Sequence, residues 1–505
     1  MATPCADLSS KASSFSCGAP AALGCRATRL FRTNSCGTCH DRLGSERGSL
    51  LARLQDPCLA TTSTVTPAPA PTPSPPPALP SSQERSSSSA SSSSPGPSQV
   101  SPDYKPKWSM LLSTEALEDA QISRAGSVTD AHVLRRKGRL KEQDGLIEFI
   151  ISMHATHSPA EVMEKMERWI REHFEDPRCS LLKKLVPSIG RFHSHLPLVQ
   201  ALQEYDQFSC LSRRKYVPPN FAEIRHVLNI AQVHAIAENL SLITFDADGT
   251  LYADGHHIER DNKMICHIIK LLQHGAHVAI VTAAGYPGEP EKFETRFAGL
   301  LAAFEDLGLP QTITSLFHIM GGECNYLLEV NEGYRLEFVE DNLWKSKDML
   351  EWSSVDIREL LSDAECTLKS AAARLRVPVE IIRKPRAVGV IPKEPTIYEV
   401  LEEMALTVQV QLVGAKLPFC AFNGGKDVFV DVGNKSVGLG ALMTYLKKKP
   451  CEMLHVGDRF TISGNDAATR SKCPILWVAN PEETAFYTRM LLRDIHVAHL
   501  TPYIE

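Results

Sequence analysis

The chain has 505 residues, of which 43% are hydrophobic and 22% are charged, and its formal net charge is −5. This length allows two or more domains, and the composition is that of a globular protein. The slight acidic balance gives no reason to expect nucleic acid as the main partner, and no apolar run approaches the ~20 residues that span a bilayer.

Residues 1–105 are predicted to form an extension without a packed core. Thr, Pro, Ala and Ser dominate residues 61–101, and such a composition cannot bury enough apolar surface to offset chain entropy. Residues 1–40 hold a single acid, Asp7, against four Lys and Arg residues. This pattern fits either an organellar transit peptide or a disordered tail. The expected compartment is the cytoplasm, with organellar targeting as the alternative.

Residues 106–238 are predicted to be a helical region. Apolar residues recur at helical spacing over 146–153 and 160–174, and another helix is expected at 221–237. A basic triplet that ends at Lys215 precedes this last helix, which carries His226. Such basic runs are usually solvated, and binding of an anion is the alternative.

From residue 242 onward, short apolar runs typical of buried parallel strands alternate with amphipathic helical segments. The expected strands cover 242–246, 277–281, 453–456 and 475–479, with a pair of short strands within 418–432. The expected helices cover 258–274 and 436–446, and a last helix begins at 481. This alternation predicts an α/β fold with a Rossmann-like parallel sheet, in which ligands bind beyond the carboxyl ends of the strands.

The first of these strands ends in two aspartates, Asp246 and Asp248, which Gly249 follows directly. Residues i and i+2 leave a strand on the same side, and two carboxylates so close repel each other unless a cation or a shared proton separates them. The arrangement indicates Mg²⁺ binding and nucleophilic or acid–base chemistry. Because Asp-Gly is also common in turns, an acidic turn is the alternative.

Three further polar residues stand at element ends. Thr282 follows the second strand, Lys435 lies in a glycine-flanked turn before a helix, and Asp458 follows the strand at 453–456. A hydroxyl and an ammonium suit phosphate oxygens, and another carboxylate suits Mg²⁺. Taken singly, Thr282 and Asp458 could be helix caps and Lys435 a solvated lysine. Their combination and order favour one shared site.

The ordered set of Asp246, Asp248, Thr282, Lys435 and Asp458 resembles the haloacid dehalogenase-like (HAD) phosphohydrolase superfamily, and an aspartate at 248 resembles its phosphatases and phosphomutases. The resemblance implies that Asp246 attacks phosphorus to form an aspartyl phosphate and that Asp248 is the general acid and then the general base. It also implies that Asp246, Asp458 and the backbone carbonyl of Asp248 hold Mg²⁺, while Thr282 and Lys435 bind phosphoryl oxygens.

The spacing of these residues predicts an inserted domain. The segment between Asp246 and Thr282 has room for little beyond one helix, whereas the segment between Thr282 and Lys435 is far longer than one strand–helix unit needs. The excess is expected to form an α/β cap at 291–414, which excludes water and supplies specificity contacts. The catalytic core is then expected at 239–290 and 415–505.

A closer resemblance rests on five segments: 185–190 (LVPSIG), 224–229 (IRHVLN), 281–286 (VTAAGY), 319–323 (IMGGE) and 422–428 (FNGGKDV). Together they resemble the IMP-specific 5′-nucleotidases. The resemblance implies hydrolysis of inosine 5′-monophosphate (IMP), a homotetramer, and a helical region that responds to ATP. It places Asp254 and Asp427 beside the nucleotide, although each could be an ordinary loop acid. ATP could contact Lys215 or His226, for which a structural role is equally compatible with the sequence.

Two other functions stay open at this point. The first is a HAD phosphatase or phosphomutase that acts on a sugar phosphate or another nucleotide. The second is a nucleotide-binding regulatory protein without turnover, although a chain that had lost activity would have no need to keep all five of Asp246, Asp248, Thr282, Lys435 and Asp458.

Overall fold

In the computed structural model, residues 144–461 and 463–500 are described, and the extension at 1–105 lies outside them. Five α-helices occupy the first part: α2 (Gly145–Met153), α3 (Pro159–Glu175), α4 (Leu181–Leu185), α5 (Leu198–Ser209) and α6 (Phe221–Ile236). The helices expected at 146–153, 160–174 and 221–237 are thus present. Capping boxes fix where α3 and α6 begin, with Ser158 and Asn220 as the capping residues. None of the helices in this part of the chain or in the rest of the described residues has the length and hydropathy that a bilayer crossing demands.

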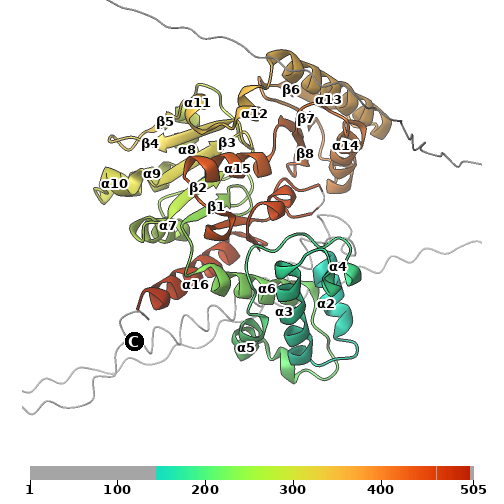
Figure 1. The fold of residues 1–505 in the computed structure, drawn as a ribbon. Helices are drawn as coiled ribbons and strands as arrows, with labels where there is room; N and C mark the ends of the chain where they lie inside the picture. Colours follow the sequence, from blue (N-terminus) through green and yellow to red (C-terminus); the bar gives the residue numbers. More distant parts are fainter. Residues whose placement is uncertain (1–143, 462, 501–505) are drawn as a thin grey trace, which may run out of the picture. The chain divides into compact units, whose positions relative to one another are not determined.

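The central sheet has seven strands in the order β11-β10-β1-β2-β3-β4-β5, of which β1 to β5 are labelled in Figure 1. Their bounds are β1 (Leu242–Asp246), β2 (His277–Val281), β3 (Phe317–Gly321), β4 (Tyr326–Val330), β5 (Leu336–Phe338), β10 (Met453–Gly457) and β11 (Ile475–Trp477). The strands from β11 to β3 pair in parallel, which confirms the predicted α/β fold. The sheet is mixed at one edge, since β4 and β5 pair antiparallel. Only a short turn joins β3 to β4, and a connection of that length forces antiparallel pairing.

Both faces of the central sheet are covered by helices. Ile243 and Phe245 of β1 are buried in an apolar cluster that includes α7 (Lys263–Gln273) and α16 (Pro481–Leu500). The alternate residue Leu242 is buried in a second cluster, with α11 (Asp341–Trp344) and α15 (Lys435–Tyr445). This alternation explains why the strands are continuous apolar runs. Because helices cover both faces, polar residues of the sheet gather at the carboxyl ends of the strands.

Several short helices connect these elements. The α-helices α8 (Pro290–Arg296), α9 (Ala298–Asp306), α10 (Gln311–Thr314) and α12 (Lys347–Leu350) and the 3-10 helices η3 (Pro450–Glu452) and η4 (Ala467–Ser471) lie between strands, and the 3-10 helix η2 (Leu211–Arg213) lies between α5 and α6.

A smaller antiparallel sheet packs against two helices around a separate apolar core. Its strand order is β6-β7-β9-β8, with β6 (Val379–Arg383), β7 (Ala387–Pro392), β8 (Phe419–Asn423) and β9 (Val428–Val432). Helices α13 (Ser354–Leu375) and α14 (Tyr398–Gln411) bury apolar residues against it, for example Leu361 and Met404 against Val430. This separate apolar cluster gives the smaller sheet the character of a domain of its own.

The two sheets do not follow the predicted bounds of the cap and the core. Strands β3, β4 and β5 lie within the range expected for the cap, 291–414, yet they extend the central sheet. Strands β8 and β9 lie within the range expected for the core, 415–505, yet they pair with β7 in the smaller sheet. A short apolar strand has the same local pattern in either sheet, so its pairing partner could not be predicted from that pattern.

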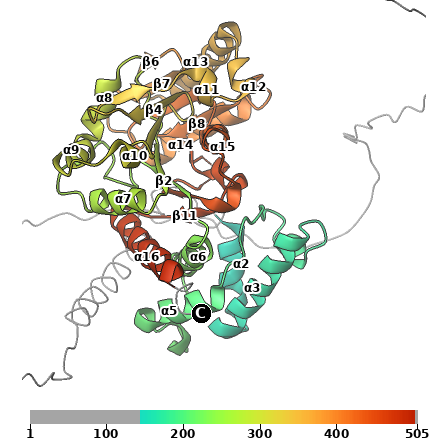
Figure 2. The same cartoon turned by 60° about the vertical axis from the view of Figure 1, so that its left-hand side comes forward.

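Hydrogen bonds join helix α6 to α16 and to β11 at the edge of the central sheet (Figure 2). Two nitrogens of the buried Arg225 guanidinium each donate to Glu483 at 2.9 Å. Asn229 donates to the carbonyl of Trp477 at 2.8 Å and accepts from its N–H at 3.2 Å. Burial works against the charge of Glu483, but the charge of Arg225 and its hydrogen bonds outweigh burial and lower the pKa of this carboxyl. The N-terminal helices therefore reach the strand that neighbours β10.

Candidate active site

Strand β1 ends at Asp246, and the loop that follows it carries Asp248. Asp246 is buried, and the side chain of Asp248 is 31% exposed. The next residue, Gly249, has a φ of 79°, and its N–H donates to the carbonyl of Tyr252 at 2.8 Å. A Cβ at position 249 would lie 2.7 Å from Oδ2 of Asp458. Glycine is therefore required for the loop to turn this close to the carboxylate that follows β10.

Lys435 is fully buried between two carboxylates. Its Nζ lies 2.7 Å from Oδ1 of Asp246 and 2.6 Å from Oδ1 of Asp466. The lysine is the first residue of α15, and the helix is capped by Asn434. Burial disfavours its charge, yet the neighbouring carboxylates outweigh burial and raise the pKa of Lys435. The side chain is thus a fixed ammonium in contact with the predicted nucleophile.

The two carboxyls that contact Lys435 differ in their electrostatics. Burial raises the pKa of Asp246 well above its ordinary value, the charges of Asp466 and Asp458 add to that rise, and Lys435 opposes it. Burial also acts on Asp466, but the charge of Lys435 and a hydrogen bond with His455 overcome it and lower the pKa. Nε2 of His455 lies 3.0 Å from Oδ1 of Asp466. Asp246 is therefore the carboxyl that still requires positive charge nearby to stay ionised.

Asp246, Asp458 and Asp466 form a buried acidic cluster. One carboxylate oxygen from each lies within 4.8 Å of the others. Carboxylate oxygens grouped in this way can hold a hard divalent cation. From the sequence, Asp246, Asp458 and the backbone of Asp248 were the predicted ligands, and no role was predicted for Asp466. The run Gly464-Asn465-Asp466 after a strand end was the available signal.

Thr282 follows β2, whose last residue Val281 is the register partner of Asp246. The residue is buried, and its carbonyl accepts from the N–H of Glu323 at 3.0 Å. Its hydroxyl oxygen accepts from the N–H of Ala284 at 3.1 Å. The hydroxyl proton is left for donation to another acceptor, because a threonine hydroxyl both donates and accepts.

Glu323 is a buried acid at the same edge, and the sequence analysis assigned it no role. Its φ of 63° is unusual for a residue with a side chain, and Oε1 accepts from Asn465 at 2.8 Å. Burial raises the pKa of Glu323, and the charge of Lys435 opposes the rise. Backbone strain of this kind gathers at functional sites. The preceding Gly321-Gly322 pair was the only local hint of the turn.

Asp248 is held by partners from the following loop and from α8. Nη2 of Arg296 lies 3.2 Å from Oδ1 of Asp248, and the N–H of Gly255 donates to the same oxygen at 3.2 Å. The guanidinium carbon of Arg296 also lies 5.8 Å from the centre of the Tyr252 ring. Arg296 is a further residue that the sequence analysis did not identify, and it fixes the orientation of Asp248.

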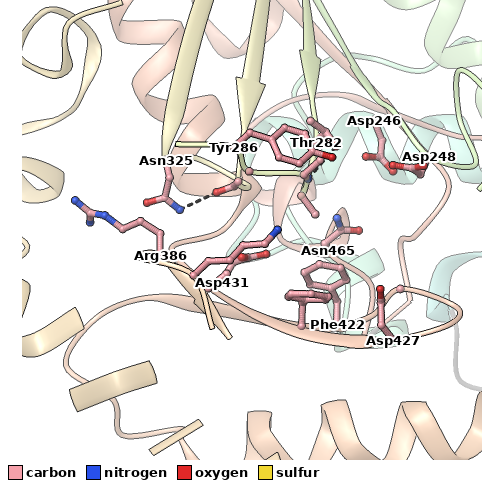
Figure 3. A pocket seen from close by; sticks show the side chains of 18 of the residues that line it. Asp246, Asp248, Thr282, Tyr286, Asn325, Arg386, Phe422, Asp427, Asp431 and Asn465 are labelled. Atoms are coloured by element: carbon pink, nitrogen blue, oxygen red, sulfur yellow. Dashed lines mark hydrogen bonds between the residues drawn. The ribbon is translucent and has the colours of Figure 1, made fainter. Parts of the chain in front are cut away.

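A cavity of about 470 Å³ extends from Asp246, Asp248 and Thr282 to the smaller sheet (Figure 3). Aromatic and charged side chains line much of the rest of it: Asp254, Tyr286, Arg296, Tyr326, Lys384, Arg386, Phe422, Lys426, Asp427, Phe429, Asp431 and Arg459. The predicted substrate residues Asp254 and Asp427 are among them. Lys435 and Asp458 are fully or almost fully buried and lie outside this lining.

The loops that carry Asp254 and Asp427 meet near Arg459. Nη2 of Arg459 lies 3.5 Å from Oδ1 of Asp254, and Nη1 donates to the carbonyl of Asn423. A Cβ at Gly425 would lie 3.7 Å from Oδ2 of Asp254. Burial raises the pKa of Asp427, and the charge of Arg459 opposes the rise. One loop from the core and one from the smaller sheet thus approach each other across the cavity.

The two candidate effector residues, Lys215 and His226, lie in different surroundings. Lys215 is exposed, and its Nζ lies 5.4 Å from the centre of the Tyr216 ring. His226 is buried, and its ring nitrogens face the hydroxyl of Tyr487 and, at 3.5 Å, Oε1 of Glu483. Burial lowers the pKa of His226 to about 4, so the ring is neutral near pH 7. Neither residue lines the cavity described above.

Comparisons with known proteins agree on one family. Residues 127–487 match the family described as IMP-specific 5′-nucleotidase. The IMP-specific 5′-nucleotidase 1 of Plasmodium falciparum is 35% identical over 370 residues, which cover 68% of this chain and 82% of the relative. The Aspergillus fumigatus protein of the same name is 43% identical over 321 residues, which cover 61% and 71%.

Two solved structures of the P. falciparum IMP-nucleotidase are also similar. The N-terminally truncated protein with IMP bound has a TM-score of 0.66 at 35% identity, over 70% of this chain and 97% of that one. The protein with ATP bound has a TM-score of 0.64 at 34% identity, over 74% of this chain and 89% of that one.

Proposed function

This chain belongs to the IMP-specific 5′-nucleotidase family and hydrolyses IMP to inosine and phosphate, and we propose that it does so through an aspartyl phosphate formed on Asp246. The observation that carries this mechanism is the contact between Asp246 and the buried ammonium of Lys435, at 2.7 Å. A carboxylate held beside a fixed cation at the end of a cavity is suited to attack a phosphoryl group.

The proposed reaction has two steps. In the first, an Oδ of Asp246 bonds to phosphorus while the bond to the 5′-oxygen breaks, and Asp248 gives its proton to that oxygen as inosine leaves. In the second, Asp248 takes a proton from a water that attacks phosphorus, and phosphate leaves Asp246. Lys435 and Thr282 hold phosphoryl oxygens in both steps. The contacts of Asp248 with Arg296 and Gly255, each at 3.2 Å, support an oriented acid–base group.

We further propose Mg²⁺ as the cofactor. The fit rests on the acidic cluster, in which oxygens of Asp246, Asp458 and Asp466 lie within 4.8 Å of one another, and on the absence of a side chain at Gly249, where a Cβ would press against Asp458. Asp246, Asp458 and the backbone of Asp248 would hold the ion, since Asp466 is engaged by Lys435 and His455. When bound, the ion supplies positive charge that neutralises phosphoryl oxygens.

The proposed function is tested by phosphate release from the purified protein with Mg²⁺. We expect kcat/KM for IMP to exceed that for AMP by about 100-fold or more, a ratio that a hydrogen-bonding site can reach. A chelator should remove the activity, and added Mg²⁺ should restore it. Comparable rates for IMP, AMP and a hexose phosphate would instead favour the broader phosphatase considered from the sequence.

We also propose that ATP binds a second cavity, of about 740 Å³, and acts on the catalytic loops from there. The cavity lies between the N-terminal helices and the core, and it is lined by Arg191, His193 and Arg470. Its core side includes Asn434 and Ser436, which flank Lys435, and the two residues that follow Asp466. The guanidinium groups of Arg191 and Arg470 suit a polyphosphate, although Arg470 also pairs with Asp144 of the lining at 2.7 Å. A ligand there would contact the segments that hold the Lys435–Asp466 pair.

A substitution in this cavity distinguishes it from Lys215 as the ATP site. Arg191→Ala should raise the ATP concentration needed for a half-maximal change in IMP hydrolysis by about 10-fold or more, because it removes a cation from the proposed site. Lys215→Ala is the matched control, since Lys215 is an exposed cation outside this cavity. ATP titrations of activity and of melting temperature measure both variants. If Lys215→Ala weakened the response to ATP and Arg191→Ala did not, the ATP site would lie at Lys215 instead.

The homotetramer is a proposal supported by the family resemblance alone. Light scattering on the eluting protein would measure the mass of the assembly directly. The cytoplasmic compartment likewise stays a prediction, and the targeting alternative depends on residues outside the described range.

A further inference from the structure

Asp431 is a buried carboxyl in the wall of the active-site cavity. It lies on β9 of the smaller sheet, it is 3% exposed, and it lines the cavity. Its Oδ2 is buried and has no hydrogen-bond partner among the described residues. A buried polar atom without a partner is costly, and such atoms are rare unless something that binds there satisfies them. Asp431 has no place in the two-step reaction above.

A cation and aromatic rings surround the same part of the cavity. Nζ of Lys384 lies 5.4 Å from the centre of the Phe429 ring and 5.7 Å from that of Tyr286. Figure 3 shows Asp431 and Phe422 apart from Asp246 and Asp248, and the Tyr286 ring beside Thr282 between them. Flat rings beside the carboxyl of Asp431 and the cations of Lys384 and Arg386 suit a planar ligand with polar atoms on its edge.

The chemistry of Asp431 decides which part of a nucleotide can lie there. A carboxylate repels a phosphate, so the phosphate end is excluded and belongs with Lys435. The loop acids Asp254 and Asp427 line the cavity near Arg459, and Asp427 lies close enough to Asp248 for their charges to interact, so both belong nearer the ribose and phosphate than the base. Burial raises the pKa of Asp431 well above its ordinary value, the charge of Glu323 adds to the rise, and Lys384 opposes it. A hydrogen-bond donor on the ligand would stabilise the carboxylate.

We propose that Asp431 and Lys384 recognise the purine base of the substrate. The carboxylate of Asp431 accepts the N1–H of hypoxanthine, and the ammonium of Lys384 donates to O6. The rings of Tyr286, Phe422 and Phe429 contact the faces of the base. This assignment rests on the proposed function, since it takes IMP as the substrate, and it makes these two residues determinants of specificity.

Asp431 and Lys384 would reject adenine because its hydrogen-bonding groups are the reverse of those of hypoxanthine. AMP carries an acceptor at N1 and an amino donor at position 6, so it would set acceptor against carboxylate and donor against ammonium. Sites that leave buried polar groups unpaired reject the wrong ligand strongly. GMP keeps both N1–H and O6. The pair therefore discriminates IMP from AMP but leaves GMP to other features of the cavity, and this difference makes the proposal specific.

The test compares Asp431→Asn with wild type on three nucleotides. We expect kcat/KM for IMP to fall by about 10-fold or more, and the ratio of IMP to AMP to fall by a similar factor, because an amide can also donate to N1 of adenine. The ratio of IMP to GMP should change by less than about 3-fold, since both bases present the same two atoms. Lys384→Met should lower the IMP to AMP ratio in the same direction.

Asp427→Asn is the matched control, because it changes another acid in the same cavity wall. It should lower kcat/KM for all three nucleotides alike and leave the ratios unchanged. Melting temperatures check that the variants fold. An unchanged IMP to AMP ratio in Asp431→Asn would overturn the assignment while leaving the proposed function intact.

Binding of free nucleosides tests the same assignment without turnover. Wild type should bind inosine more tightly than adenosine, and Asp431→Asn should lose that difference. Equal binding of the two nucleosides by wild type would overturn the assignment. Wild-type protein that released no phosphate from IMP would overturn the proposed function itself, and the binding comparison would still decide the role of Asp431.

Discussion

Replacing Asp246 with asparagine should lower kcat for phosphate release from IMP by at least about 10⁴-fold, because an amide cannot attack phosphorus as a carboxylate does. The change should not unfold the protein. Lys435 keeps Asp466 as a partner at 2.6 Å, and the acidic cluster loses one of three crowded charges. We expect a melting temperature equal to or above that of wild type. Initial rates at saturating IMP and Mg²⁺, together with thermal denaturation, measure both effects.

Asp306→Asn controls for the chemistry of the substitution. Asp306 lies on the surface, 3.0 Å from Arg260, and its loss should leave the rate unchanged. A direct readout comes from IMP labelled at phosphorus and quenched with acid during turnover. Wild type should retain label on the protein and Asp246→Asn should retain none. Label held by the variant, or a rate above about 1% of wild type, would assign the nucleophile to another residue.

The part of the site that could be predicted is the part encoded locally. Asp246 ends a buried strand and Thr282 and Asp458 each follow one, and parallel strands align their carboxyl ends. The strand pattern and the first polar residue after it are visible in a few consecutive letters. The sheet pairing of β1 with β2 and β10 then brings these residues to one edge.

The rest depends on which surfaces meet, and no local pattern contains that. Asp466 and Asp431 are ordinary acids in the sequence, and they become distinctive because the fold buries them beside Lys435 and in the cavity wall. Sheet membership has the same origin, since β9 carries Asp431 into the smaller sheet although it was expected in the core. The sequence left His226 open between a contact with ATP and a structural role, and the fold buries it in a hydrogen bond with Tyr487.

Lys435→Met should combine a large loss of activity with a large loss of stability. Methionine fills the space of the lysine stem but leaves Asp246 and Asp466 buried without their shared cation. Removing one partner of a buried pair costs about 3–5 kcal/mol of unfolding free energy. Without the ammonium, the folded-state pKa of Asp466 should rise above its unfolded value. The loss of unfolding free energy caused by Asp466 should then be small below its unfolded pKa and should grow as pH rises toward its new folded pKa.

Urea denaturation of wild type and variant at pH 5 and pH 8 measures this loss, and the difference between them should be larger at pH 8. Lys369→Met is the matched control, because it breaks an exposed pair with Glu365 of similar length, 2.7 Å. Exposed pairs contribute little, so this control should change neither stability nor rate. If Lys435→Met lost no more stability than the control, Lys435 would not be the charge that holds Asp246 and Asp466 together. A stable but inactive variant would instead confine the role of Lys435 to the phosphoryl group.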